Sequence, residues 1–133
     1  MHPDYIYELT MKVRDYEVDS QGIVNNANYL HYLEHTRHEF CDSVGASFHA
    51  MQEREIDPVV ARVEIDYRSP LHMGETFVSK LALERQGIRF VFYQDIFRTD
   101  GTLVVKGRII VAPTRRGRLT RGDEMADLFK NYL

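Results

Sequence analysis

The sequence predicts an α+β domain in which an antiparallel sheet of five or six strands packs against one long helix. One segment repeats apolar residues at helical spacing, and five segments, one before it and four after it, have the character of strands. Glycine and proline turns separate the later strands. Residues 1–133 have the length of one domain, and no linker, repeat or low-complexity tract divides them, so a single domain is expected.

The first expected strand lies at residues 9–14, where apolar and polar residues alternate as they do on a half-buried strand. The long helix is expected to run from residue 28 to about residue 44, and Gly45 supplies its end. Its apolar residues at helical spacing are Tyr29, Leu30, Leu33, Phe40, Cys41 and Val44. One face of this helix is therefore expected to be buried and the other exposed.

Four further strand-like segments lie at residues 59–67, 77–84, 89–97 and 103–112. The turn residues between them are Ser69-Pro70 with Met73-Gly74, then Gln86-Gly87, then Asp100-Gly101. Strands joined by such turns are expected to pair with their neighbours in the chain, antiparallel. Residues 123–132 predict a short terminal helix.

Composition and charge exclude several classes of protein. The chain is 44% hydrophobic and 28% charged with a net charge of −3, which favours neither nucleic acid nor an anionic membrane as partner. The N-terminal MHPDYIYELTMKV lacks the apolar core of a signal peptide, and no apolar run approaches the roughly 18 residues of a membrane span. A cytoplasmic protein is expected. The lone cysteine, Cys41, occupies an apolar helix position, which favours a packed side chain over a catalytic thiol.

Residues 17–29, EVDSQGIVNNANY, place an aspartate and a glycine just before the start of the long helix. Aspartate is common in turns because its side chain accepts bonds from nearby backbone N–H groups, and the asparagines at 25, 26 and 28 are typical helix caps. The other interpretation is catalytic. A carboxylate beside the free N–H groups of a helix start can act on a carbonyl whose oxygen those groups stabilise.

The segment VRDYEVDSQGIVNNANYLHYLEHTR, residues 13–37, resembles the signature of the 4-hydroxybenzoyl-CoA thioesterase family of hotdog-fold proteins. The matching residues are Asp19, Gly22, Ile23-Val24, Asn28-Tyr29, Glu34 and Arg37. A second segment, IDYRSPLHMGE at 65–75, resembles the family's second strand and turn, so the likeness covers about residues 8–113. It implies a hotdog fold, an antiparallel five- to six-stranded sheet wrapped around one long central helix. It also implies a homodimer or homotetramer that hydrolyses acyl-CoA without cofactor or metal.

The resemblance implies roles for individual residues. Asp19 would be nucleophile or general base, the backbone N–H of Asn26 would polarise the thioester carbonyl, and Gly22 would allow the sharp turn. Family members often carry His or Tyr where this chain has Asn26. The difference is tolerable if only the backbone N–H takes part, whereas a role for the side-chain ring would imply a changed activity or substrate range. Substrate binding is implied for Ile23, Val24, Tyr29, Arg85 and Arg89.

Other functions stay open. The Val24-Asn25-Asn26 stretch is also similar to plant-type acyl-ACP thioesterases, whose pattern is D-x-N-x-H-V-N-N. Gln21 and Ile23 stand here at its Asn and His positions, and Ile23 cannot transfer a proton, so that three-residue mechanism is not available. An acyl-ACP substrate, an aromatic acyl-CoA of quinone biosynthesis and a catalytically silent acyl-thioester-binding module remain alternatives.

Three weaker patterns have a structural and a functional interpretation each. The histidines at 31, 35 and 38 form a helix stripe, for which a polar face is favoured over a metal site. Glu34 and Arg37 are either an ion pair or a contact between helix and sheet. The basic residues between Gly101 and Gly122 suit either CoA phosphates or ordinary ion pairs: Lys106, Arg108, Arg115, Arg116, Arg118 and Arg121.

Overall fold

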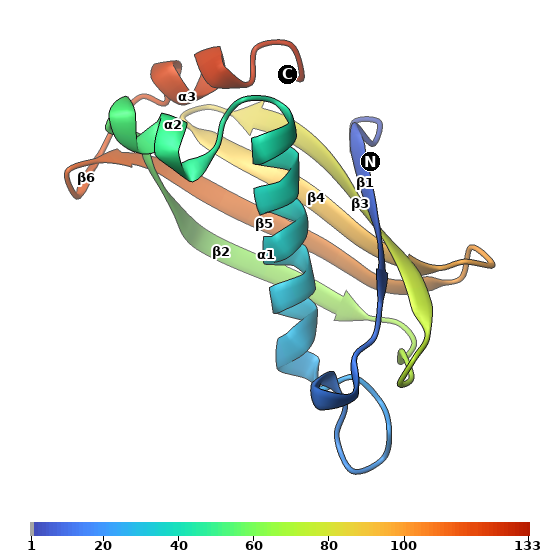
Figure 1. Cartoon of the computed structure of the whole chain (residues 1–133). Coiled ribbons are helices and arrows are strands. Elements are labelled where there is room, and N and C mark those ends of the chain that lie inside the picture. The colour runs from blue at the N-terminus through green and yellow to red at the C-terminus, as the bar shows by residue number, and fades with distance from the viewer. Residues whose placement is uncertain (1) are drawn as a thin grey trace.

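The structure is a computed structural model that describes residues 2–133, and it confirms the predicted α+β fold. Its elements are β1 (Tyr7–Lys12), η1 (Asp15–Glu17), α1 (Asn26–Ser43), α2 (Phe48–Glu53), β2 (Asp57–Tyr67), β3 (Thr76–Gln86), β4 (Arg89–Arg98), β5 (Leu103–Arg115), β6 (Arg118–Leu119) and α3 (Asp123–Leu128). The sheet has the order β1–β3–β4–β5–β2, with β6 on β5, and all pairs are antiparallel. The sheet curls around α1, the hotdog arrangement (Figure 1).

The long helix begins two residues earlier than predicted because Asn25 is its cap. The Asn25 side chain accepts a hydrogen bond from the backbone N–H of Ala27 at 3.0 Å. At the other end Gly45 adopts a left-handed conformation with φ of 78°, and the N–H of Ala46 turns back to the carbonyl of Cys41 at 2.8 Å. The predicted glycine stop is therefore confirmed.

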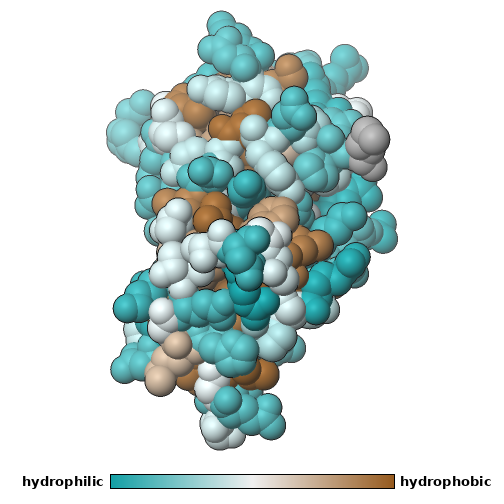
Figure 2. Space-filling view, turned by 90° about the vertical axis from the view of Figure 1, so that its right-hand side faces the viewer, coloured by the Kyte–Doolittle hydropathy of each residue, from teal (hydrophilic) through white to brown (hydrophobic). Residues whose placement is uncertain are grey.

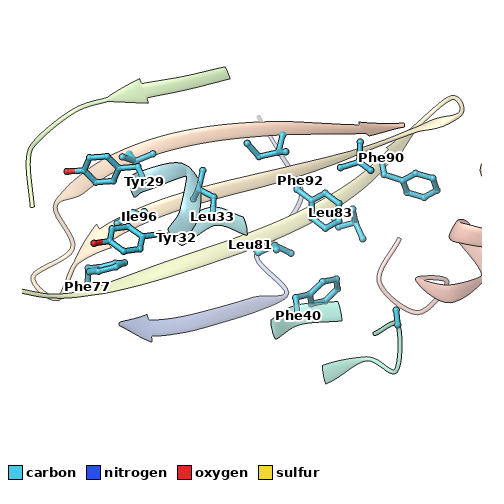
Figure 3. Packing of buried hydrophobic residues seen from close by; sticks show 14 of the residues in the cluster. Tyr29, Tyr32, Leu33, Phe40, Phe77, Leu81, Leu83, Phe90, Phe92 and Ile96 are labelled. Carbon is cyan, nitrogen blue, oxygen red and sulfur yellow. The ribbon is translucent and has the colours of Figure 1, made fainter. Parts of the chain in front are cut away.

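One face of α1 packs on the concave face of the sheet (Figure 3). The buried residues of the helix are Tyr29, Tyr32, Leu33, Thr36 and Phe40. Gly107 on β5 allows this close packing, since a Cβ there would lie 2.7 Å from the Gln94 carbonyl oxygen and 3.1 Å from a Leu33 methyl. The prediction that Leu30 is buried was wrong: it lies beside this face and is 40% exposed.

Polar side chains fix the helix against the sheet within this apolar layer. The buried Gln94 of β4 donates to the Leu33 carbonyl at 2.8 Å and accepts from the Arg37 guanidinium at 2.9 Å. Thr36 donates to the hydroxyl of Ser79 on β3 at 2.8 Å. Arg37 thus contacts the sheet, as one of its two interpretations proposed, and its hydrogen bond goes to Gln94 instead of Glu34.

The strand order corrects one prediction. β2 and β3 are consecutive in the chain but do not pair, because β1 occupies the edge of β3 while β2 joins the opposite edge beside β5. Residues 68–75 connect the end of the edge strand β2 to the start of the interior strand β3, and Arg98 holds this connection by donating to Glu75 at 2.6 Å and to Ser69 at 2.9 Å. The curl of the sheet brings the end of β2 close enough to the start of β3 for so short a crossing (Figure 1).

Sequence periodicity missed the short elements η1, α2 and β6, which are too short to show a repeat. The predicted terminal helix exists as α3 but ends at Leu128. Among residues 2–133, no helix has both the length and the apolar character needed to cross a membrane.

Candidate active site

The aspartate of the predicted site opens a small hairpin that leads directly into α1, at the bottom of Figure 1. Val18 and Val24 form an antiparallel bridge that closes the hairpin. Inside it, the N–H of Asp19 donates to the carbonyl of Ile23 at 2.9 Å, and the N–H of Gly22 donates to the Asp19 carbonyl at 3.0 Å. Gly22 has a φ of 77°, a conformation that side chains disfavour, so the turn requires glycine there.

The two carboxylate oxygens of Asp19 have different surroundings. Oδ1 accepts from the backbone N–H of Gln21 at 2.8 Å and from that of Ile23 at 3.4 Å, so the turn interpretation is correct for this atom. Oδ2 accepts no hydrogen bond from any of residues 2–133, and the side chain is exposed. One oxygen fixes the side chain while the other is free to act on a ligand.

The start of α1 presents an unpartnered backbone donor. The Asn25 side chain accepts a hydrogen bond from the N–H of Ala27, and the Asn25 backbone carbonyl accepts one from the N–H of Asn28 at 2.9 Å. The N–H of Asn26 has no acceptor among the described residues, and Asn26 is exposed. This donor lies at the positive end of an 18-residue helix, where negative charge on a ligand is stabilised.

A buried carboxylate that sequence reasoning missed, Glu17, supports this loop. It is 5% exposed, and it accepts hydrogen bonds from the Arg14 backbone at 2.7 Å, the Arg14 guanidinium at 2.8 Å and the Tyr32 hydroxyl at 2.9 Å. Its backbone carbonyl accepts from the N–H of Asn25 and the side chain of Asn28. The sequence carried little signal for this role, because arginine cannot supply the side-chain acceptor of a capping box, and only the bond from the Arg14 N–H to the carboxylate of Glu17 follows the capping-box spacing.

These bonds determine the charge of Glu17. Burial raises the pKa of this carboxyl, but the hydrogen bonds donated by Arg14 and Tyr32 outweigh burial and hold the pKa below its usual range. Burial and the neighbouring carboxylate in turn raise the pKa of Tyr32. Glu17 is therefore ionised and Tyr32 neutral at pH 7.

Three residues predicted to contact the substrate, Ile23, Val24 and Tyr29, lie where the hairpin packs against residues 71–74 of the connection between β2 and β3. The N–H of Val24 donates to the Leu71 carbonyl at 2.9 Å, and the N–H of Leu71 donates to the Tyr29 hydroxyl at 3.1 Å. Val24 and Tyr29 are each 4% exposed, so their side chains fix the loop from inside. Ile23 is half-buried and forms a bridge with His72. Substrate contact by these three residues stays a prediction.

Arg85 and Arg89 lie far from the hairpin within one chain. The hairpin contacts the connection that leads into β3, which starts at Thr76. Arg85 lies nine residues further along β3, which at 3.3 Å per residue places it about 30 Å from Thr76. Its guanidinium binds Asp123 at 2.9 Å. Arg89 is exposed, and its side chain has no hydrogen bond among the described residues. A single chain therefore does not bring these arginines to the carboxylate.

The basic segment before α3 divides into paired and unpaired residues. Arg115 and Arg116 both bind the carboxylate of Glu55, at 2.8 Å and 2.6 Å. Arg118 and Arg121 are exposed, and neither has a carboxylate within 4.0 Å among residues 2–133. The ion-pair interpretation is thus right for the first two arginines and leaves the other two available to a phosphate.

The histidine stripe does not converge on one point. His31 and His35 are exposed, and His35 approaches Glu39 at 3.8 Å. His38 lies edge-on to the ring of Phe48, with centroids 4.6 Å apart. Within residues 2–133, no three His, Cys, Asp or Glu side chains are grouped closely enough to hold a metal ion.

Cys41 has the environment of a packed thiol. It is half-buried on α1, and burial raises its pKa to about 12, although the nearby Arg37 opposes the rise. A thiol with this pKa carries almost no thiolate at neutral pH, and the thiolate is the nucleophilic form. The carboxylate of Asp19 remains the better placed group for acyl chemistry.

Several known proteins are similar to this chain in sequence or in fold. The model of the Thioesterase-like superfamily matches residues 13–130. The chloroplastic acyl-acyl carrier protein thioesterase ATL2 of Arabidopsis thaliana is 38% identical over 93 residues, which are 69% of this chain and 50% of that protein. The long-chain acyl-CoA thioesterase FadM of Escherichia coli is 37% identical over 73 residues, 53% of this chain and 54% of that protein. The chain thus spans about half the length of these two curated relatives.

A solved structure shows the same fold. The crystal structure of a hypothetical protein from Aquifex aeolicus superposes with a TM-score of 0.84 at 27% sequence identity. The superposition covers 92% of this chain and 98% of that one. The arrangement of sheet and central helix is therefore shared over nearly the whole of both chains.

Proposed function

The chain belongs to the Thioesterase-like superfamily, and from this membership we propose that it hydrolyses acyl-CoA thioesters to a free acid and CoA. The observation that carries the proposal is the presence, in one loop, of the free oxygen of Asp19 and the unpartnered N–H of Asn26. A nucleophile or base and an oxyanion donor are the two parts that thioester hydrolysis needs. The finer assignment to 4-hydroxybenzoyl-CoA thioesterases rests on the sequence motif.

The proposed reaction uses the two groups together. The thioester carbonyl oxygen accepts from the Asn26 N–H, and Asp19 removes a proton from a water whose oxygen attacks the carbonyl carbon. The oxyanion that forms is stabilised by the same N–H and by the helix dipole. The carbon–sulfur bond then breaks, and the leaving thiolate takes the proton from Asp19. In the alternative route Asp19 itself attacks the carbonyl carbon, the carbon–sulfur bond breaks to release the CoA thiolate, and water hydrolyses the resulting mixed anhydride to the free acid and the Asp19 carboxylate.

The carrier of the acyl group has a second candidate. The name of FadM supports acyl-CoA, whereas the 38% identity to ATL2 favours acyl-ACP. A panel of aliphatic and aromatic acyl-CoAs and acyl-ACPs, with detection of the free thiol, separates them. Cleavage of an acyl-CoA supports the proposal, and cleavage of acyl-ACP alone supports the second candidate. Binding without cleavage of any thioester identifies a silent binding module and contradicts the proposal.

In a dimer, an arginine that lies far from the carboxylate within one chain can come from the partner subunit. We therefore expect Arg89→Ala to raise KM for acyl-CoA several-fold with little change in kcat, because a free guanidinium suits the CoA phosphates. The same change should leave KM for an acyl-pantetheine, which lacks those phosphates, unaltered. Arg116→Ala is the control, since Glu55 already engages that side chain. Equal effects of Arg89→Ala on both substrates would remove Arg89 from phosphate binding.

The two sheet edges differ in a way that supports a homodimer. The edge strand β1 exposes the polar residues Glu8, Thr10 and Lys12, and the side of the molecule seen in Figure 2 is mostly hydrophilic with small separate apolar patches. The edge strand β2 exposes large apolar side chains: Val59, Val60, Val63 and Tyr67, between 43% and 51%. Exposed apolar edges favour strand pairing between chains. The proposed assembly is a homodimer through β2, or a homotetramer of such dimers.

We expect Val63→Lys to abolish this assembly, because a charge at the apolar edge opposes close pairing with a second copy. Sedimentation velocity at micromolar concentration should show a dimer or tetramer for the unmodified chain and a folded monomer with little activity for Val63→Lys. Thr10→Lys, the same change on the β1 edge, should leave the assembly intact. A folded monomer of the unmodified chain would contradict the proposed pairing.

A further inference from the structure

The backbone carbonyl of Glu17 joins the hairpin of the candidate active site to the start of α1. It accepts two hydrogen bonds from this region of the helix, one from the backbone N–H of Asn25 at 3.1 Å and one from the side-chain amide of Asn28 at 2.8 Å. Asp19 follows Glu17 by two residues, and Asn26 follows Asn25 directly. The strand that carries the carboxylate is therefore tied to the helix turn that carries the free donor.

Asn28 makes this contact from the third position of α1. In a capping box, the side chain at this position is a glutamate or glutamine that accepts a hydrogen bond from the backbone N–H of the cap. Here the N–H of the cap, Asn25, donates to the Glu17 carbonyl instead, and the Asn28 amide donates to the same oxygen. A carboxylate could not take the place of this amide, because an ionised carboxylate only accepts. The residue type at position 28 thus points to a role in the hairpin contact.

The bond from Asn28 is separable from the stability of the loop. Asn28 is half-buried, and the Glu17 carbonyl keeps its bond from the Asn25 N–H when the amide is removed. The Glu17 carboxylate keeps its own donors, Arg14 and Tyr32. No buried polar group of Glu17 loses its last partner, which is the costly case. Loss of the Asn28 amide should therefore loosen the hairpin against the helix without unfolding either.

We propose that Asn28 is a positioning residue for the hydrolysis. Its amide holds the strand of Asp19 against the start of α1, so that the carboxylate and the Asn26 N–H act on the same thioester carbonyl. The inference rests on the proposed function. Asn28 does not touch the reacting atoms and acts through the Glu17 carbonyl. Such a role has a large effect on rate, because a displacement of about 1 Å can cost about a hundredfold.

Steady-state kinetics of substituted proteins test this role. Asn28→Ala should lower kcat at least about tenfold and leave KM within about twofold, because the groups that act in the transition state are displaced while the binding surface is kept. Asn28→Asp keeps the shape but loses the donor and places a charge at the Glu17 carbonyl, so kcat should fall at least as far. The control is Asn131→Ala, which removes an exposed asparagine outside α1 and should keep full activity. Normal kcat in folded Asn28→Ala overturns the inference.

A double-mutant cycle with Asp19→Asn separates positioning from a general structural effect. If Asn28 acts by placing the Asp19 carboxylate, little remains for it to place once that carboxylate is an amide. Adding Asn28→Ala to Asp19→Asn should then lower the remaining single-turnover rate by less than about twofold. Independent effects multiply, so a further tenfold loss in the double variant overturns the inference.

Amide hydrogen exchange measures the same contact without a substrate. Asn28→Ala should raise the exchange rate of the Asn25 N–H several-fold, because the remaining bond at the Glu17 carbonyl must hold the two segments together alone. The N–H of Ala46, which is bonded to the Cys41 carbonyl at the far end of α1, should exchange at an unchanged rate. An unchanged exchange rate at Asn25 overturns the inference. Asn28→Ala that is unfolded without urea also overturns it, because Asn28 is then a structural residue.

These outcomes are distinct from a failure of the proposed function. If the unmodified protein cleaves no acyl thioester, the proposed hydrolysis fails and the positioning role fails with it. If the unmodified protein cleaves acyl-CoA, Asp19→Asn is slow and folded Asn28→Ala has normal kcat, the hydrolysis stands and only the role of Asn28 fails.

Discussion

Replacing Asp19 with Asn is expected to lower kcat for the best acyl-CoA substrate at least about a hundredfold, the usual minimum contribution of a positioned base. Asparagine keeps the Oδ1 acceptor that binds the Gln21 N–H at 2.8 Å, so the hairpin should persist. It loses the negative charge and the basicity that either catalytic route needs. The measurements are kcat by thiol release and the unfolding midpoint in urea, which should change little.

Asp15→Asn is the matched control, because Asp15 is an exposed acid four residues earlier, in η1. It should leave kcat within a few fold. If Asp19→Asn retained near-normal turnover while folded, Asp19 would be a turn residue only, and Glu34 or a histidine of the α1 stripe would be the next candidate.

Replacing Glu17 with Ala is expected to lower the free energy of unfolding by about 2 kcal/mol and to remove most activity. The buried hydroxyl of Tyr32 would lose its acceptor, and an unsatisfied buried donor costs about 1–3 kcal/mol. The Arg14 bonds that set the approach to the hairpin would also be lost. Urea unfolding measures the change, with exposed Glu53→Ala as control. Full stability of Glu17→Ala would show that the loop holds without this carboxylate.

Glu17 also makes the free energy of unfolding depend on pH. The pKa of Glu17 is lower in the folded chain than in the unfolded chain, so its ionisation stabilises the fold above the unfolded pKa of about 4.3, and this contribution is lost as pH falls through the folded pKa. The stability difference between the unmodified chain and Glu17→Ala should therefore be constant near pH 7 and shrink below about pH 4. A difference that grew in acid would contradict the assigned sign.

Local features of the fold followed from the sequence because their causes are local. Gly45 ends α1 through its own left-handed conformation, and Gly22 makes the hairpin turn for the same reason. The pairing of β2 with β5 did not follow, since it depends on which strand reaches each edge of a curled sheet. The exposure of Leu30 likewise depends on the space beside β2, which helical periodicity does not report.

The candidate site likewise has local features that the sequence predicts and other features that depend on tertiary packing. The free donor at Asn26 was predictable, because every helix start leaves backbone N–H groups unpaired. Glu17 was missed because its partners include Tyr32, fifteen residues later, and its burial comes from the packing of α1 on the sheet. A cavity beside the C-terminal half of α1 could not be predicted from the sequence, because the residues that line it, from Glu34 to Phe129, lie on separate elements.

The proposed catalysis depends on the Asp19 carboxylate and the start of α1 acting together on a bound thioester. A single-turnover experiment isolates this step, with enzyme in excess over an acyl-CoA and thiol release followed in time, because product release then does not affect the rate. Asp19→Asn should bind the acyl-CoA intact and cleave it at least about a hundredfold more slowly than the unmodified chain. Cleavage of the bound thioester by folded Asp19→Asn at the unmodified rate would show that this carboxylate does not carry the reaction.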